Sequence, residues 1–169
     1  MAKFKHNEYK YNMLKILTNP DPILRQKAKP VTNFSDKKLQ KLIPEMIETM
    51  QKSDGVGLAA PQVGESIRLA VVTYRKKTIV LINPEITKKS LMREWGEEGC
   101  LSVPTIYGDV KRHKKITVNY LDAQGKKQTI QAFGMLARII QHEVDHLDGI
   151  LFIDKAKKLF TLTPHESND

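Results

Sequence analysis

The hydrophobic positions of this chain predict two helices on either side of a long run of strands. The first helix lies between Ser35 and Gly55, where apolar side chains recur at the helical period. Its apolar positions are Leu39, Leu42, Ile43, Met46, Ile47 and Met50. The helix begins near Ser35 or Asp36 and ends at Asp54-Gly55. Pro44 lies inside this stretch and predicts a kink or a local restart.

The second helix lies near the C-terminus and has the same period. Its apolar positions are Leu136, Ile139, Ile140, Val144 and Leu147. Gly134 precedes it, and Asp148-Gly149 supply a helix-ending signal. Met135 and Ile139 extend the apolar character to a further face, so we expect this helix to be apolar nearly all round and buried at the centre of the domain.

Between the two helices the pattern changes to short segments rich in Val, Ile, Thr and Tyr, which is typical of strands. The predicted strands cover residues 68–74, 78–82, 85–92, 116–121 and 129–133, with Val110 as a further strand position. Asp122-Ala123-Gln124-Gly125 is typical of a hairpin turn. Most connections are too short for helical crossovers. We therefore expect an α+β fold, with mostly antiparallel sheets around the second helix and the amphipathic first helix near the N-terminus.

Length and composition predict one domain over residues 1–169, with a basic N-terminal extension at 1–12 and a short polar tail at 159–169. No apolar run is long enough to span a bilayer, and the lysine-rich start lacks the hydrophobic core of a secretion signal. The expected compartment is a cytoplasm of bacterial type, with an organellar origin left open. The net charge of +9 favours anionic partners, but the lysines are scattered and form no nucleic-acid motif.

A histidine pair gives the second helix a candidate chemistry. Gln141-His142-Glu143-Val144-Asp145-His146 contains the pattern H-E-x-x-H. On a helix, His142 and His146 lie one turn apart on the same face, so two neutral imidazoles can bind one divalent metal ion. Glu143 projects beside them, where it can take a proton from a metal-bound water. The alternative is a helix whose two histidines are merely satisfied polar groups.

A catalytic site of the zinc type needs a third protein ligand and one open position. Downstream, Phe152 occupies the place of the third histidine in longer motifs, and the only glutamate there is Glu166 in the polar tail. Upstream, Cys100 is the single cysteine of the chain. A lone cysteine without a secretion signal is either a thiolate ligand or a buried small hydrophobe, and we favour the ligand.

Residues 55–64 combine small side chains with glycines, which lets the backbone approach a ligand or a packed neighbour closely. The segment is not a phosphate loop, because it lacks the G-K-[ST] ending. A buried tight turn and a binding site are equally good interpretations of these residues alone. Gln62 is the polar exception, with an amide donor that could face a substrate carbonyl.

Three separated segments together resemble the peptide deformylase family. Gly55-Val56-Gly57-Leu58-Ala59-Ala60-Pro61-Gln62 matches G-x-G-x-A-A-x-Q, Glu98-Gly99-Cys100-Leu101-Ser102 matches E-G-C-x-S, and His142-Glu143-Val144-Asp145-His146 matches H-E-x-D-H. They occur in the order that the family has, and the resemblance extends over residues 17–154. One such motif alone is weak; three in register are specific.

The resemblance implies a metal-dependent hydrolase that removes the formyl group from the N-terminal formylmethionine of new polypeptides and releases formate. It implies that Cys100, His142 and His146 hold one divalent metal ion per chain. Fe²⁺ is the expected native metal, while Zn²⁺, Ni²⁺ or Co²⁺ can occupy such a site in a purified sample. The expected partners are therefore N-formylmethionyl nascent polypeptides.

The mechanism that the resemblance implies assigns roles to further residues. Metal-bound water attacks the formyl carbon while Glu143 acts as general base and then as general acid. The Leu101 backbone N–H and the Gln62 side-chain amide are the implied oxyanion donors. The substrate-binding positions that it implies are Val56, Gly57 and Ile139.

Two further expectations concern residues near the cysteine segment. Glu98 and Arg112 are expected to form an ion pair that fixes the Cys100 loop, the alternative being an exposed surface pair worth little. Tyr107 stands where some members of the family have an arginine, which puts a substrate contact at that point in doubt.

The chain also ends without the long basic C-terminal helix with which some members dock on the ribosome. Only a weak electrostatic association with the ribosome is therefore left open by the net charge of +9. Three rival hypotheses are a peptidase that uses the same H-E-x-x-H site, a basic nucleic-acid-binding protein without a metal, and a deformylase-like protein without activity. All three motifs are intact, which favours the active deformylase.

Overall fold

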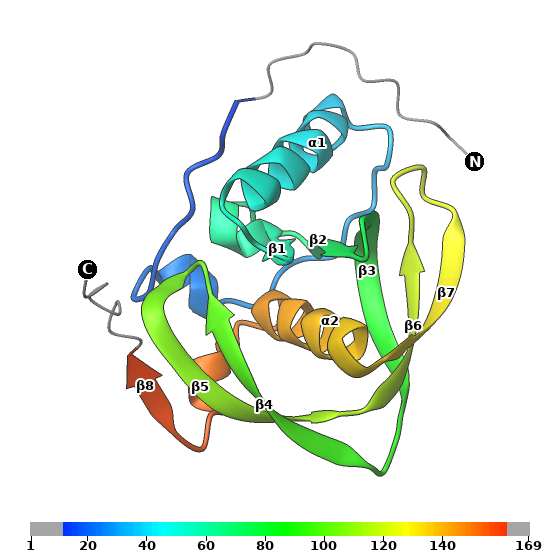
Figure 1. Cartoon of the computed structure of the whole chain (residues 1–169). Coiled ribbons are helices and arrows are strands. Elements are labelled where there is room, and N and C mark those ends of the chain that lie inside the picture. Colours follow the sequence, from blue (N-terminus) through cyan, green and yellow to red (C-terminus); the bar gives the residue numbers. More distant parts are fainter. Residues whose placement is uncertain (1–11, 162–169) are drawn as a thin grey trace.

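The computed structural model describes residues 12–161, so the predicted basic extension lies outside the described residues except for Asn12. Within this range the chain forms two α-helices, eight strands and three short 3-10 helices (Figure 1). The helices are α1 (Lys37–Lys52), α2 (Gly134–Leu147), η1 (Pro22–Arg25), η2 (Ala60–Val63) and η3 (Phe152–Asp154). The strands are β1 (Gly57–Ala59), β2 (Leu69–Tyr74), β3 (Lys77–Lys89), β4 (Arg93–Cys100), β5 (Val103–His113), β6 (Lys115–Leu121), β7 (Lys127–Phe133) and β8 (Leu159–Thr161).

The strands form two antiparallel sheets, which confirms the expected α+β class. One sheet has the order β1-β2-β3-β6-β7 and the other the order β4-β5-β8. In Figure 1, α2 lies between the two sheets, while α1 covers β1 and β2 from the other side. Among the described residues, neither α-helix has the length and apolar character needed to cross a membrane.

Helix α1 forms where the apolar stripe predicts it. Its N-terminus is capped by Asp36, whose Oδ1 accepts a hydrogen bond from the Lys38 N–H at 2.9 Å. The helix continues without interruption through Pro44, so the prediction of a restart there is wrong. The carbonyl that loses its partner belongs to Gln40, which is exposed, so water can replace the missing hydrogen bond.

The strands are longer than the hydrophobic pattern predicts. The two segments expected at 78–82 and 85–92 are one strand, β3, in which a register shift between Ile82 and Glu85 accommodates Asn83-Pro84. The pattern around Val110 extends to all of β5. Strand β4 was not expected at all, because Arg93–Cys100 is charged and rich in glycine; its pairing with β5 along the whole strand holds it in place.

The prediction of a polar tail from residue 159 is wrong for its first three residues. Leu159–Thr161 form β8, which pairs with Ile106–Gly108 of β5. Phe160 stacks on Tyr107, with ring centroids 6.4 Å apart. This contact gives the short strand an apolar anchor, and the rest of the predicted tail, 162–169, lies outside the described residues.

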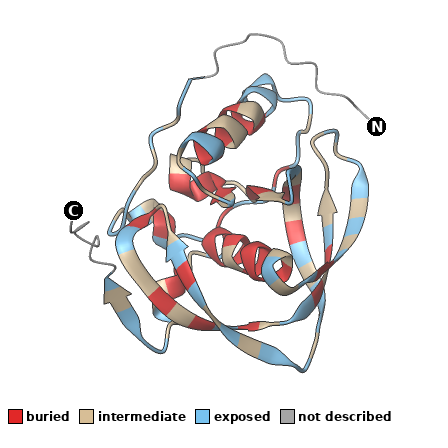
Figure 2. Cartoon of the chain, viewed as in Figure 1, coloured by how far each residue is buried: buried red, intermediate tan, exposed pale blue. Residues whose placement is uncertain are grey.

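The core surrounds α2, whose residues from Ala137 to Leu147 are buried or nearly so (Figure 2). One cluster of buried side chains joins α1 to β1 and β2, with Met46 and Met50 completely buried. A second joins α2 to the five-stranded sheet. A third, around Phe152, lies under β5. The polar residues of α2 are therefore held in a rigid interior.

Candidate metal centre

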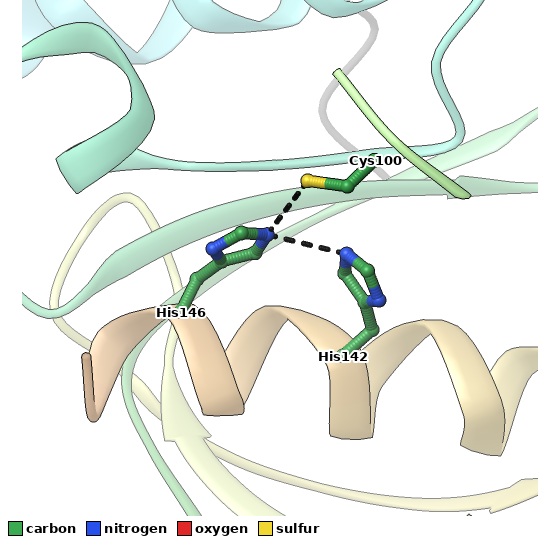
Figure 3. Close-up of side chains that lie close together, drawn as sticks. All are labelled: Cys100, His142 and His146. Atoms are coloured by element: carbon green, nitrogen blue, oxygen red, sulfur yellow. Dashed lines mark hydrogen bonds between the residues drawn. The ribbon is translucent and has the colours of Figure 1, made fainter. Parts of the chain in front are cut away.

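Helix α2 brings the two histidines of the H-E-x-x-H pattern together on one face. The Nε2 atoms of His142 and His146 lie 3.2 Å apart, as the i, i+4 spacing predicts. Both side chains point toward Cys100, which ends β4 (Figure 3). Its Sγ lies 3.2 Å from Nε2 of His146. Three side chains from two distant segments thus form one cluster.

This cluster has the composition of a metal site. One sulfur and two nitrogen donors lie within 4.8 Å of one another, so Cys100, His142 and His146 could hold a metal ion. Nδ1 of His142 lies 3.0 Å from the Glu98 carboxylate, which fixes that nitrogen as the donor and leaves Nε2 free to face the other two ligands. The donor set and its orientation both fit a divalent ion.

The two histidines differ in protonation when no metal is bound. Burial lowers the pKa of His146 well below its usual 6.5, which keeps this imidazole neutral and able to ligate. Burial alone would also lower the pKa of His142, but hydrogen bonds to Cys100 and Glu98 and the charge of Glu143 raise it to about 10. Without a metal, His142 therefore keeps a proton, and a binding cation would displace that proton.

Glu98 is the centre of a buried ionic network behind the histidines. Arg112 donates from Nε and Nη2 to its two carboxylate oxygens, both at 2.9 Å. Arg112 also donates to Asp145, and Lys155 Nζ lies 2.6 Å from that carboxylate. Burial would raise the pKa of Glu98, but the bonds from Arg112 and His142 outweigh it and hold the pKa far below 4.5. Glu98 therefore stays ionised and orients His142.

Arg138 completes this network and was missed by the sequence analysis. It lies on α2, is 7% exposed, and donates from Nη1 to Glu98 at 2.8 Å and to the Val110 carbonyl at 3.0 Å. It also reaches the carbonyls of Glu94 and Gly96 on β4. A Cβ at Gly96 would lie 2.7 Å from the guanidinium, so only glycine leaves room for it. The available signal was a lone arginine within an otherwise apolar helical stretch.

Glu143 lies beside the cluster and lacks a partner at one oxygen. Among the described residues, its buried Oε2 accepts no hydrogen bond. Burial is the main cause that raises the pKa of this carboxyl, to about 7. A Cβ at Gly57 would overlap the same carboxylate, so that glycine makes the space that Glu143 occupies. This arrangement suits a group that gains and loses a proton near neutral pH.

Gln62 and Ser102 both approach the sulfur of Cys100. The Gln62 Oε1 accepts from the Ala59 N–H at 2.8 Å, which orients the amide group. Its Nε2 then donates to Ser102 Oγ at 3.0 Å and approaches Cys100 Sγ at 3.5 Å. Ser102 is completely buried, and its own N–H points at the same sulfur from 3.4 Å. Two N–H groups thus face the Cys100 sulfur.

A pocket of about 490 Å³ opens onto this cluster. Its walls include most of the residues that the sequence analysis selected, namely Val56, Gly57, Gln62, Glu98, Cys100, Leu101, Ile139, His142 and Glu143. Tyr107, Met135 and Arg138 are among its other lining residues, whereas His146 and Arg112 do not line it. The structure thus brings these predicted residues to one pocket, which Cys100 and His142 of the three metal-ligand candidates line directly.

Comparisons with known proteins agree with this geometry. The polypeptide deformylase family model matches residues 13–161. A peptide deformylase of Natranaerobius thermophilus is 50% identical over 147 residues, covering 86% of this chain and 94% of the relative. One of Dictyoglomus thermophilum is 53% identical over 136 residues, covering 80% and 88%. The crystal structure of the Thermotoga maritima peptide deformylase superposes with a TM-score of 0.84 at 46% identity, covering 87% of this chain and 99% of that one. With a matched family model across nearly the whole described range and relatives at this identity, the chain belongs to the peptide deformylase family of enzymes.

Proposed function

We propose that this enzyme hydrolyses the formyl amide of N-formylmethionine at the start of new polypeptides and releases formate. The observation that carries the proposal is the buried Glu143 carboxyl, whose Oε2 has no hydrogen-bond partner among the described residues, beside a Cys-His-His cluster that a pocket reaches. A general base, a metal-ligand set and an open substrate space are the three parts that such a hydrolysis needs.

We assign Cys100, His142 and His146 as the ligands of one divalent metal ion. The thiolate and imidazole donors suit several such ions, and we propose Fe²⁺ as the native one, with Zn²⁺, Ni²⁺ or Co²⁺ able to replace it. When bound, the ion would lower the pKa of a water molecule and polarise a carbonyl oxygen. Glu98 keeps His142 in the required tautomer from behind.

Glu143 moves the proton in the proposed mechanism. Its carboxylate takes a proton from the attacking water and later delivers it to the departing amine nitrogen of methionine. Because burial brings the pKa of Glu143 to about 7, both the charged and the protonated forms are accessible near neutral pH. Among the described residues, the buried Oε2 has no hydrogen-bond partner, so no bond of that oxygen has to break when the carboxyl gains or loses a proton.

The negative charge that develops on the formyl oxygen needs hydrogen-bond donors. We propose the Leu101 backbone N–H and the Gln62 side-chain amide for this role. The Ala59 N–H holds the Gln62 oxygen away from the cluster, so its NH₂ group faces the Cys100 side. One amide hydrogen can remain on Ser102 while the other turns to the substrate.

The pocket walls are the proposed binding site for the methionine and the following backbone. Val56 and Ile139 offer apolar surface to the methionine side chain, and Gly57 lets an extended peptide approach the backbone closely. Selection by such an apolar pocket is modest, about 1–3 kcal/mol per methylene. A substrate that lacks the formyl group keeps the side-chain contacts but has no formyl amide to hydrolyse.

A paired-substrate assay tests this proposal. We would measure formate release from formyl-Met-Ala-Ser under anaerobic conditions, with metal content determined on the same sample and unformylated Met-Ala-Ser as the matched control. We expect formate release at about one equivalent of metal and no cleavage of the control. Cleavage of the unformylated peptide would favour a peptidase, and metal without either activity would contradict the assigned substrate.

A further inference from the structure

A second pocket, of about 310 Å³, lies on the other side of the buried ionic network from the metal centre. It forms where the end of β3, the start of β4 and the end of β5 meet α2 and the segment after η3. Its walls are Ile86, Lys89, Arg93, Lys111, Arg112, His113, Gln141, Asp145 and Lys155. None of these residues lines the first pocket, so the two cavities are separate.

The charges around this pocket are strongly unbalanced. Five of its lining side chains are cationic and only one, Asp145, is a carboxylate. Asp145 is already paired with Arg112 and Lys155. Among residues 12–161, Lys89, Arg93 and Lys111 form no ion pair with an acidic side chain, whereas the nearby Lys114 does, with Glu94. Repulsion among these cations would be relieved by a bound anion.

The frame of the pocket is fixed before any ligand binds. Gln141 bridges both backbone groups of His113, with Nε2 donating to its carbonyl at 3.0 Å and Oε1 accepting from its N–H at 3.1 Å. His113 Nδ1 lies 2.6 Å from the Ser90 carbonyl, so this nitrogen donates the hydrogen bond and fixes the ring. Arg93 Nη2 lies 3.3 Å from the Lys111 carbonyl. Gln141 and His113 therefore form a fixed wall, next to which the cationic side chains of the pocket lie.

We propose that this pocket binds a small multivalent oxyanion of the sulfate or phosphate type. A tetrahedral oxyanion accepts several N–H donors at once, which matches the lysine and arginine residues that line this pocket from separate strands. A carboxylate would use fewer of these donors, and a chloride ion only their charge. The proposal does not depend on the proposed reaction, because the two pockets share no lining residue.

An anion titration of the whole, metal-loaded protein tests this proposal. The protein is loaded with Zn²⁺, and backbone amide NMR shifts are followed as sulfate replaces chloride at constant ionic strength; inorganic phosphate is titrated in the same way. We expect saturable shifts for Arg93, Lys111 and His113 and none for Gly57 or Leu101. Linear shifts without saturation would show diffuse screening alone, and shifts centred on Gly57 and Leu101 would place the anion at the metal; either result would overturn the proposal.

Two charge-matched double variants sharpen the test. Arg93→Gln/Lys111→Gln removes two exposed cations from the pocket and should weaken sulfate binding about tenfold or more. Lys76→Gln/Lys77→Gln removes the same charge at the opposite end of β3 from Lys89 and should leave the affinity unchanged. Equal weakening in both variants would mean that only net charge matters, and it would contradict a defined site.

Discussion

The two α-helices of this protein differ in what their buried polar groups contact. In α1, the buried Thr49 donates to the Glu45 carbonyl of its own helix at 2.7 Å. In α2, the buried Arg138 reaches Glu98, 40 residues away on β4, and His142 contacts the same carboxylate. Thr49 also accepts from the Leu14 N–H at 2.9 Å, so this side chain joins α1 only to the segment at the start of the described chain, whereas polarity in α2 ties together the elements that build the pocket. We expect α1 to govern stability and the polar residues of α2 to govern chemistry.

Of the substitutions that distinguish α2 from α1, those at Glu143 should have the largest effect on turnover. Replacing it by Ala or Gln removes the proposed proton carrier and should lower turnover by about 10²–10⁴-fold. The metal content should stay the same, because Glu143 is not one of the three candidate ligands. Its unpartnered Oε2 also means that no described hydrogen bond of that atom is lost. Retained formate release in both variants would remove Glu143 from the mechanism.

Arg138 tests whether α2 organises the site through the buried ionic network around Glu98. Arg138→Met leaves Glu98 without one donor and three backbone carbonyls without their partner. Breaking such a buried pair should lower the free energy of unfolding by about 3–5 kcal/mol. Denaturant unfolding would measure the loss. Arg138→Lys keeps the charge but not the forked geometry, so it should recover only part of the stability; an Arg138→Met protein as stable as the wild type would contradict this role.

Met46 tests the opposite expectation for α1. Met46→Ala opens a cavity in a completely buried position and should cost about 2–5 kcal/mol of unfolding free energy. The kcat of the folded fraction should not change, because Met46 is not among the residues of either pocket. Gln51→Ala, an exposed position on the same helix, should shift stability by no more than about 0.5 kcal/mol. A fall in kcat for Met46→Ala would contradict the expectation that α1 governs stability and not catalysis.

Glu98 should also make the stability of the protein depend on pH. Its pKa lies below the unfolded value of 4.5, so its contribution to stability is fully present above pH 4.5 and declines as the pH falls below that value. Unfolding of the metal-free protein and of Glu98→Gln, compared between neutral and acidic pH, measures this contribution. The stability difference between the two should shrink on acidification, and a constant difference would argue against an ionised Glu98.

The sequence predicts the parts of this structure that depend on local periodicity. The boundaries of α1 and the histidine spacing on α2 could be anticipated because residues three and four positions apart share a helix face. The Glu98–Arg112 contact could be expected once the cysteine motif was recognised, and the structure places the two side chains together. Local signals and one motif were enough for these features.

Features that depend on distant partners could not be predicted. Arg93–Cys100 has no apolar alternation, so β4 exists because β5 pairs with it. The role of Arg138 depends on carbonyls of that unexpected strand. Leu159–Thr161 are too few to give a periodic signal, and only their pairing with β5 makes them a strand. In each case the interaction joins residues that are far apart in the sequence, and no local pattern predicts which of them pair.

X-ray absorption spectroscopy of the metal-loaded protein would test the central claim most directly. The proposed ligands Cys100, His142 and His146 predict one sulfur at about 2.3 Å and two imidazole nitrogens at about 2.0–2.1 Å from bound zinc. The sulfur signal should disappear in Cys100→Ser. A zinc site without a sulfur neighbour in the wild-type protein, or an identical spectrum in Cys100→Ser, would contradict the assignment of this cluster as the metal centre.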